Sequence, residues 1–103
     1  MIDLNELSKN ALETAKKREW KGQLRSDTMS ILKHCAGEVV EATEAYKEVE
    51  EAILYGGETR CRNAFADELA DVITCALIAA AQEGVDIESA LRRVQEKNRR
   101  RLE

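Results

Sequence analysis

The sequence predicts an all-α fold, a bundle of four helices, and three observations lead to this prediction. The 103 residues include no proline and only 4% aromatic residues, whereas β-sandwiches and β-barrels need turn residues and aromatic strands. Hydrophobic residues recur along most of the chain at the 3.6-residue period of a helix. The 44% hydrophobic and 35% charged residues are typical of a globular protein. We therefore expect a single helical domain over residues 1–103.

The first two helices are delimited by typical start and stop residues. The first is expected from about Asp3 to Trp20. The second is expected to begin after Asp27, an N-cap residue, and to continue to about Leu54. The pair Gly56-Gly57 then interrupts the helical pattern.

The third and fourth helices follow the glycine pair. The third is expected from about Cys61 to Glu83 and ends before Gly84, a typical C-terminal residue. The fourth begins after the N-cap Asp86 and ends in the basic run KNRRR. A chain of this length buries only about 65% of the surface that its unfolded form exposes, so we expect homo-oligomerisation to complete the bundle.

Composition also restricts location and partners. No apolar run reaches the roughly 18 residues that a membrane span needs, and the N-terminus lacks the character of a signal peptide. The three cysteines, Cys35, Cys61 and Cys75, are odd in number and widely spaced, which indicates reduced thiols. A net charge of −4 argues against nucleic acid as a partner. These features predict a cytoplasmic protein with no membrane partner.

One acidic residue interrupts the most hydrophobic segment of the chain, and another directly precedes that segment. The run LADVITCALIAAA is apolar almost all the way round a helix, which is typical of a helix surrounded by others, yet it contains Asp71. Glu68 lies one turn earlier. A buried carboxylate is costly unless it is paired or binds a metal, and residues at i and i+3 have Cβ atoms about 5–6 Å apart. Glu68 and Asp71 could therefore bind one cation together.

Glu38 and Glu41 repeat this spacing on the preceding helix. On their own they could equally be surface residues. Two such pairs on adjacent antiparallel helices predict a metal site, and carboxylate oxygens favour Mg²⁺ or Mn²⁺. A di-iron site needs two Glu-x-x-His motifs, which the single histidine, His34, cannot supply. Mg²⁺ bound by carboxylates usually takes further ligands from substrate phosphates, so the expected chemistry is attack of water on a phosphate chain.

With these motifs the sequence resembles the MazG-like all-α nucleoside triphosphate pyrophosphohydrolases, a superfamily that includes dimeric dUTPases and dCTP pyrophosphatases. Its signature is an ExxE pair on one helix and an ExxD pair on the next. Here Glu41 and Glu68 are 27 positions apart, and the blocks GEVVEATEAYK, DELADVITCALIAA and GVDIESALRRVQEKNRRR also resemble the family. The resemblance covers about residues 20–101 and implies a four-helix MazG-like bundle.

The resemblance implies a Mg²⁺-dependent hydrolase that cleaves a (d)NTP to the (d)NMP and pyrophosphate in nucleotide-pool housecleaning. Mn²⁺ is an alternative metal, and a homodimer or homotetramer is the implied assembly. Glu38 or Glu41 would be the catalytic base, with Glu41 preferred. The implied metal ligands are Glu38, Glu41, Glu68 and Asp71, and the implied substrate-binding residues are Trp20, Lys97, Asn98, Arg99 and Arg101.

Other interpretations of the same residues remain open. The basic tail could be a solvated helix end, Trp20 a core residue, and His34 either a neighbour of the metal site or an interface residue. The sequence has Gly37 where many family members have a glutamate, and Val94 where many have a lysine. These departures favour the alternative function, a non-catalytic helical interaction module that retains a degraded metal site.

Overall fold

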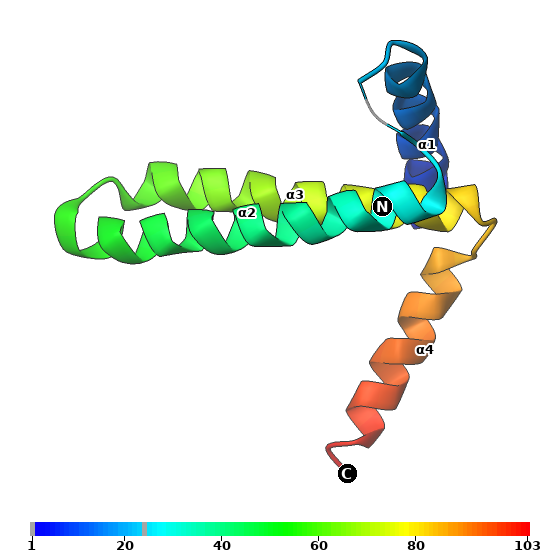
Figure 1. Cartoon of the computed structure of the whole chain (residues 1–103). Coiled ribbons are helices and arrows are strands. Elements are labelled where there is room, and N and C mark those ends of the chain that lie inside the picture. Colours follow the sequence, from blue (N-terminus) through cyan, green and yellow to red (C-terminus); the bar gives the residue numbers. More distant parts are fainter. Residues whose placement is uncertain (1, 24) are drawn as a thin grey trace.

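The computed structural model describes residues 2–23 and 25–103, and within them it contains four α-helices and no β-strand. The all-α prediction is therefore confirmed (Figure 1). The helices are α1 (Leu4–Trp20), α2 (Thr28–Tyr55), α3 (Glu58–Gln82) and α4 (Ile87–Arg100).

Local capping interactions determine where the helices begin. The side chain of Asp27 accepts a hydrogen bond from the backbone N–H of Ser30, and Asp86 accepts one from Ser89 in the same way. Each contact satisfies a backbone donor that has no partner within its helix. Both predicted N-caps are confirmed.

The third helix begins earlier than its hydrophobic pattern indicated. Its first residue is Glu58 rather than Cys61, directly after Gly57, whose φ of 88° lies in the left-handed region. The added turn contains an ion pair of 2.8 Å between Nε of Arg62 and Oε2 of Glu58. This turn is polar, and for that reason apolar periodicity did not reveal it.

The helices α2 and α3 form a long antiparallel hairpin, which we call the central hairpin (Figure 1). The helix α1 packs across the base of this hairpin, mainly against α3, and α4 departs from the same end on the other side. The core at the base joins Ala15 of α1, Ile31 of α2, and Cys75 and Ile78 of α3. This core fixes the orientation of α1 relative to the hairpin.

The single chain is more open than the predicted compact bundle. Its radius of gyration is 16.2 Å, whereas a compact domain of about 100 residues has one near 13 Å. No residue of α4 is buried, and the main packing of α4 is against α1. Leu69 and Ile73 of α3 are 44% and 58% exposed, so the prediction that other helices surround α3 is wrong within one chain. In the described part of the chain, α3 packs mainly against α2 and α1, and these two helices leave the side chains of Leu69 and Ile73 partly uncovered.

The three cysteines agree with the expectation of reduced thiols. Cys35, Cys61 and Cys75 are all free thiols. Burial, the largest cause, raises the pKa of the Cys75 thiol to about 11. None of the described helices combines the length and the hydrophobicity that a membrane span needs.

Candidate metal centre

The central hairpin brings the two acidic motifs together. One carboxylate oxygen from each of Glu38, Glu41 and Glu68 lies within 4.8 Å of the others, and we call these three residues the acidic cluster. Because α2 and α3 are antiparallel neighbours, residues 27 positions apart in sequence meet on one edge of the hairpin. Mg²⁺ binds oxygen ligands at about 2.0–2.1 Å, so small side-chain rotations would let all three oxygens reach one ion.

Burial of the cluster also fits a bound cation. Oε2 of Glu38 and Oε2 of Glu68 are buried and have no hydrogen-bond partner within the described part of the chain. Burial and then the charges of neighbouring carboxylates raise the pKa of Glu38 and of Glu68 above the ordinary value. An uncompensated buried carboxylate is costly, and a divalent cation would supply both the missing partner and the missing charge. The donor set, entirely carboxylate oxygen, suits Mg²⁺ or Mn²⁺.

The fourth predicted ligand, Asp71, lies at the border of the cluster. It is exposed and is not one of the three residues whose oxygens converge. Its charge contributes to the raised pKa of both Glu38 and Glu68, so it lies close to both. Glu41 is also exposed, as the helical position of its side chain predicted.

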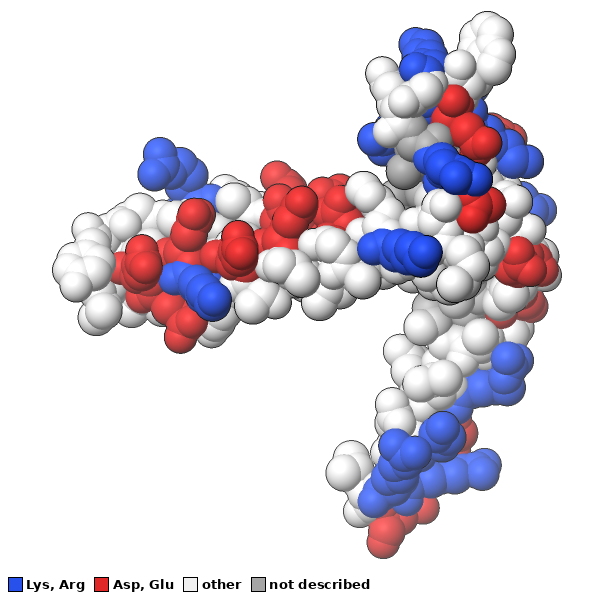
Figure 2. Space-filling view, in the orientation of Figure 1, with Lys and Arg blue, Asp and Glu red and all other residues white. Residues whose placement is uncertain are grey.

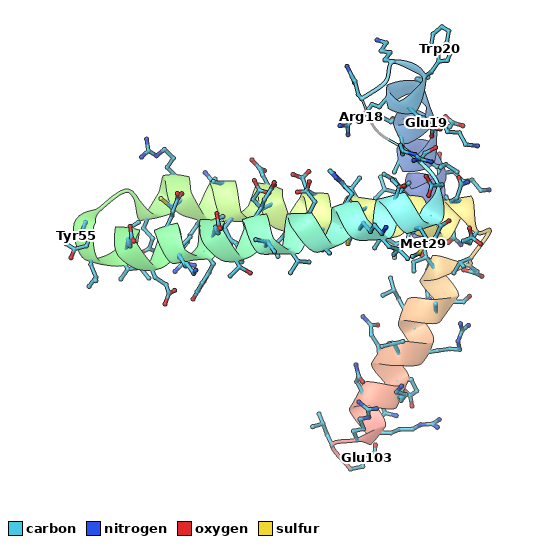
Figure 3. The ribbon with its side chains drawn as sticks, viewed as in Figure 1. Arg18, Glu19, Trp20, Met29, Tyr55 and Glu103 are labelled. Carbon is cyan, nitrogen blue, oxygen red and sulfur yellow. The ribbon has the colours of Figure 1, made fainter. Side chains whose placement is uncertain are left out.

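A hollow of about 260 Å³ lies beside the acidic cluster, between α1 and the central hairpin. Its apolar wall includes Ile31 and Ile78, and its polar lining residues are Arg18, His34, Glu38, Asp71 and Thr74. Figure 3 shows Arg18 near the C-terminal end of α1. We call this space the corner hollow.

The sequence left open whether His34 is a neighbour of the metal site or an interface residue. In the structure, His34 lies next to Glu38 of the acidic cluster. Nε2 of His34 is 3.1 Å from Oε1 of Glu38, one helical turn away. The imidazole can therefore orient this carboxylate while Oε2 stays available for a cation. Arg18, in contrast, was not predicted, because it belongs to no motif and reaches the hollow only through packing of α1 on α3.

The predicted substrate-binding residues lie outside the corner hollow. Trp20 ends α1 and is 89% exposed, so its interpretation as a core residue is wrong (Figure 3). Lys97, Asn98 and Arg99 lie on α4 and Arg101 follows it; the helix extends away from the central hairpin (Figure 1). Arg99 forms ion pairs with Glu96 and Glu103.

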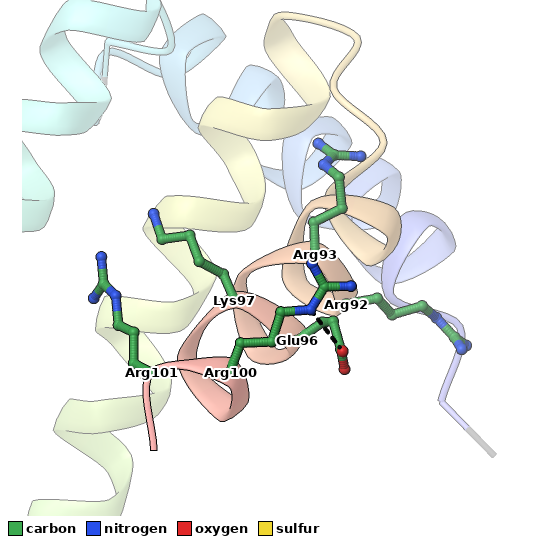
Figure 4. A pocket seen from close by; sticks show the side chains of 6 residues that line it. All are labelled: Arg92, Arg93, Glu96, Lys97, Arg100 and Arg101. Carbon is green, nitrogen blue, oxygen red and sulfur yellow. Dashed lines mark hydrogen bonds and ion pairs between the residues drawn. The ribbon is translucent and has the colours of Figure 1, made fainter. Parts of the chain in front are cut away.

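The cations of α4 gather around a shallow surface hollow of their own. Figure 4 shows that its lining side chains include Lys97 and Arg101, beside an ion pair of 3.2 Å between Arg100 and Glu96. In the view of Figure 2, acidic side chains gather along the central hairpin, whereas α4 carries a concentration of basic ones. On this face, the central hairpin is thus mainly acidic and α4 mainly basic.

Four helices with a carboxylate cluster on a central hairpin define an all-α protein with a candidate centre for a divalent cation. A sequence model of the MazG nucleotide pyrophosphohydrolase domain matches residues 26–103, so the chain belongs to the MazG family. No curated protein and no solved structure matches it significantly. The matched region includes the acidic cluster and α4 but not α1.

Proposed function

We propose that this protein is a Mg²⁺-dependent nucleoside triphosphate pyrophosphohydrolase that converts a (d)NTP to the (d)NMP and pyrophosphate. The observation that supports it most is the convergence of Glu38, Glu41 and Glu68, with two buried carboxylate oxygens that lack partners. Membership of the MazG family supports the reaction class. The proposed role is housecleaning of the nucleotide pool in the cytoplasm.

In this proposal Glu38, Glu41, Glu68 and Asp71 hold Mg²⁺, with Mn²⁺ as a substitute. The bound cation would supply charge neutralisation of the phosphates and activation of water. Glu41 is the proposed base, because its carboxylate is exposed while it shares the cluster with the half-buried Glu38 and Glu68. It would take the proton of the attacking water. The water oxygen bonds to one of the two phosphorus atoms that flank the bridging oxygen between the α and β phosphates. The bond from that phosphorus to the bridging oxygen breaks, and the (d)NMP and pyrophosphate leave.

In this proposal, the predicted substrate-binding residues on and after α4 come from a second copy of the chain. Within one chain α4 extends away from the acidic cluster, so its cations are separate from the proposed reaction centre (Figure 1). We therefore propose a homodimer or homotetramer in which Lys97, Asn98, Arg99 and Arg101 of one copy contact phosphates bound at the cluster of another. Trp20, with its exposed indole, is the proposed surface for stacking on the base.

The experiment that tests the function measures pyrophosphate release from a panel of canonical and modified (d)NTPs. Reactions contain Mg²⁺, Mn²⁺ or EDTA, and Glu68→Gln is compared with wild type. We expect metal-dependent release that Glu68→Gln eliminates while the helical content stays unchanged. Asp67→Asn is the matched control, because Asp67 is exposed and adjacent but lies outside the cluster.

Two results would contradict the proposal. Full activity of Glu68→Gln would show that the cluster is not the reaction centre. Failure of the wild type to release pyrophosphate from any substrate, together with no binding of Mg²⁺ or Mn²⁺ by calorimetry, would favour the non-catalytic interaction module.

A further inference from the structure

We propose that Arg18, on α1, binds the phosphate oxygens of the substrate within the corner hollow of the same chain. This inference rests on the proposed function and adds a binding residue from outside the region that the family model matches. The ligand class is a metal-bound polyphosphate.

The lining of the corner hollow carries the inference. Arg18 shares this hollow with Glu38 of the acidic cluster and with Asp71 at its border. A guanidinium is always protonated at neutral pH, so it is a permanent cation beside these acids. Among the described residues, no carboxylate oxygen forms an ion pair with Arg18 within 4.0 Å, so its donors remain available to an anion.

The backbone of Arg18 is anchored on both sides. One turn earlier, Ala15 is 1% exposed and packs in the core with Ile31 and Cys75. One residue later, Glu19 accepts a hydrogen bond of 2.7 Å from the backbone N–H of Ser26, which ties the end of α1 to the segment before α2. The position from which the Arg18 side chain extends is therefore fixed relative to the acidic cluster.

The charge of the site requires such a cation. Three carboxylates converge at the proposed metal position and Asp71 lies at their border, and a polyphosphate is itself strongly negative, so one divalent ion leaves excess negative charge. Arg donates two parallel N–H groups to phosphate oxygens, and such charge-assisted hydrogen bonds are among the strongest in proteins. Phosphates bound to a cation at the cluster must lie next to it, and the corner hollow with Arg18 adjoins it. The other cations proposed to bind the phosphates lie on or just after α4, and they would have to come from another copy of the chain.

The test compares Arg18→Gln and Arg18→Lys with wild type. Calorimetry measures binding of inorganic pyrophosphate in the presence of Mg²⁺, and steady-state kinetics measures KM for a (d)NTP. We expect Arg18→Gln to weaken pyrophosphate binding and to raise KM about tenfold or more, because it removes a charged hydrogen-bond donor. Arg18→Lys should give an intermediate loss, since it keeps the charge without the planar pair of donors.

Two controls separate this role from a structural one. Lys17→Gln changes an exposed cation on the same helix that does not line the corner hollow, and it should leave binding and KM unchanged. Affinity for Mg²⁺ alone should not fall in Arg18→Gln. A fall in metal affinity, or the same change in Lys17→Gln, would overturn the inference in favour of a general effect of charge on the site.

Failure of the inference and failure of the proposed function give different results. An active wild type whose KM and pyrophosphate affinity are unaffected by Arg18→Gln would overturn only the role of Arg18. A wild type that releases no pyrophosphate would overturn the enzyme function, and the calorimetric comparison would still decide whether Arg18 binds the anion. A wild type that does not bind pyrophosphate with Mg²⁺ would overturn the inference as well.

Discussion

The buried carboxylate oxygens of Glu38 and Glu68 make the metal-free site locally unfavourable. Burial and like charge raise the pKa of both groups, which means that their ionised forms are disfavoured in the fold. Above those pKa values both groups ionise, and the stability of the metal-free fold falls as the pH rises through them. A bound cation would offset this penalty by pairing the charges.

We therefore expect Mg²⁺ to stabilise the fold at neutral pH. A ligand at a hundred times its Kd stabilises by about 2.7 kcal/mol, and the melting temperature should rise accordingly. Thermal denaturation in Mg²⁺ and in EDTA measures the difference. In Glu68→Gln the difference should be lost, because one ligand charge is missing, while Asp67→Asn should retain it. Equal melting temperatures of the wild type in Mg²⁺ and EDTA would show that the cluster binds no cation in the folded protein.

His34 is expected to act on the metal through Glu38. Its Nε2, 3.1 Å from Oε1 of Glu38, restrains one carboxylate oxygen and leaves the other for the cation. Loss of such an orienting contact typically weakens metal affinity 10- to 100-fold, so His34→Ala should raise the Kd for Mg²⁺ about tenfold. Calorimetry measures it, and Lys33→Ala, an exposed neighbour outside the corner hollow, is the control. Unchanged affinity would mean that the histidine has no part in the site.

Sequence spacing was sufficient to predict the acidic cluster but not its surroundings. The i,i+3 pairs and the antiparallel hairpin together bring Glu38, Glu41 and Glu68 to one edge of the hairpin. Both the spacing within a helix and the pairing of successive helices can be predicted from the sequence. Arg18 is 20 positions from Glu38 and belongs to another helix. Its position depends on the core contact of Ala15 with Ile31 and Cys75, and no periodicity encodes the direction in which α1 crosses the hairpin.

At the scale of helices, ends were predictable where a side chain caps the backbone. Asp27 and Asp86 begin α2 and α4 as expected, and Gly84, with φ of 66°, lies just past the end of α3. The start of α3 was missed by three residues because Glu58 and the two residues after it present no apolar stripe. Caps are local interactions, whereas a polar first turn gives no hydrophobic signal.

Asp86 links the start of α4 to α1, and this link should depend on pH. Its carboxylate accepts hydrogen bonds from the side chain of Asn5 and from the backbone and hydroxyl of Ser89, and these lower its pKa to about 2. The ordinary value is 3.8. Because the pKa is lowered in the folded state, the stabilisation is complete above about pH 4 and is lost as the pH falls towards about 2.

We expect Asp86→Asn to lower the melting temperature at neutral pH and to reduce the further loss of stability between about pH 4 and pH 2. Thermal denaturation across this range measures both effects. Glu13→Gln, at an exposed position of α1 outside the capping contacts, should behave as the wild type. An Asp86→Asn variant with the acid response of the wild type would mean that other groups cause it.

At the scale of the whole molecule, the four predicted helices are present in the described residues, but a single chain leaves hydrophobic faces of α2, α3 and α4 exposed. The exposed side chains of Val39, Tyr46 and Leu69 line an apolar hollow of about 450 Å³ between α2 and α3. On α4, Leu91 and Val94 are also exposed, at 40% and 48%. Hydrophobic periodicity shows which face a helix buries but not whether its cover comes from the same chain or another. These faces are the structural reason to expect an oligomer.

The proposed oligomer should be detectable directly and through the proposed reaction centre. Light scattering at micromolar concentration should give a multiple of the 11.6 kDa chain mass, and a value of about 12 kDa would contradict it.

If cations of α4 serve the acidic cluster of another copy, two inactive variants should complement each other. One variant is Glu68→Gln, and the other is a double variant, Lys97→Gln with Arg101→Gln.

After denaturation and joint refolding of these two variants, half of the randomly formed dimers are heterodimers. Each heterodimer has one site with both an intact cluster and intact α4 cations, so about a quarter of the wild-type activity should return. If each site instead used the cations of its own chain, every site in the mixture would lack either Glu68 or the α4 cations, and no activity would return. Mixing with Asp67→Asn in place of Glu68→Gln controls for recovery during refolding.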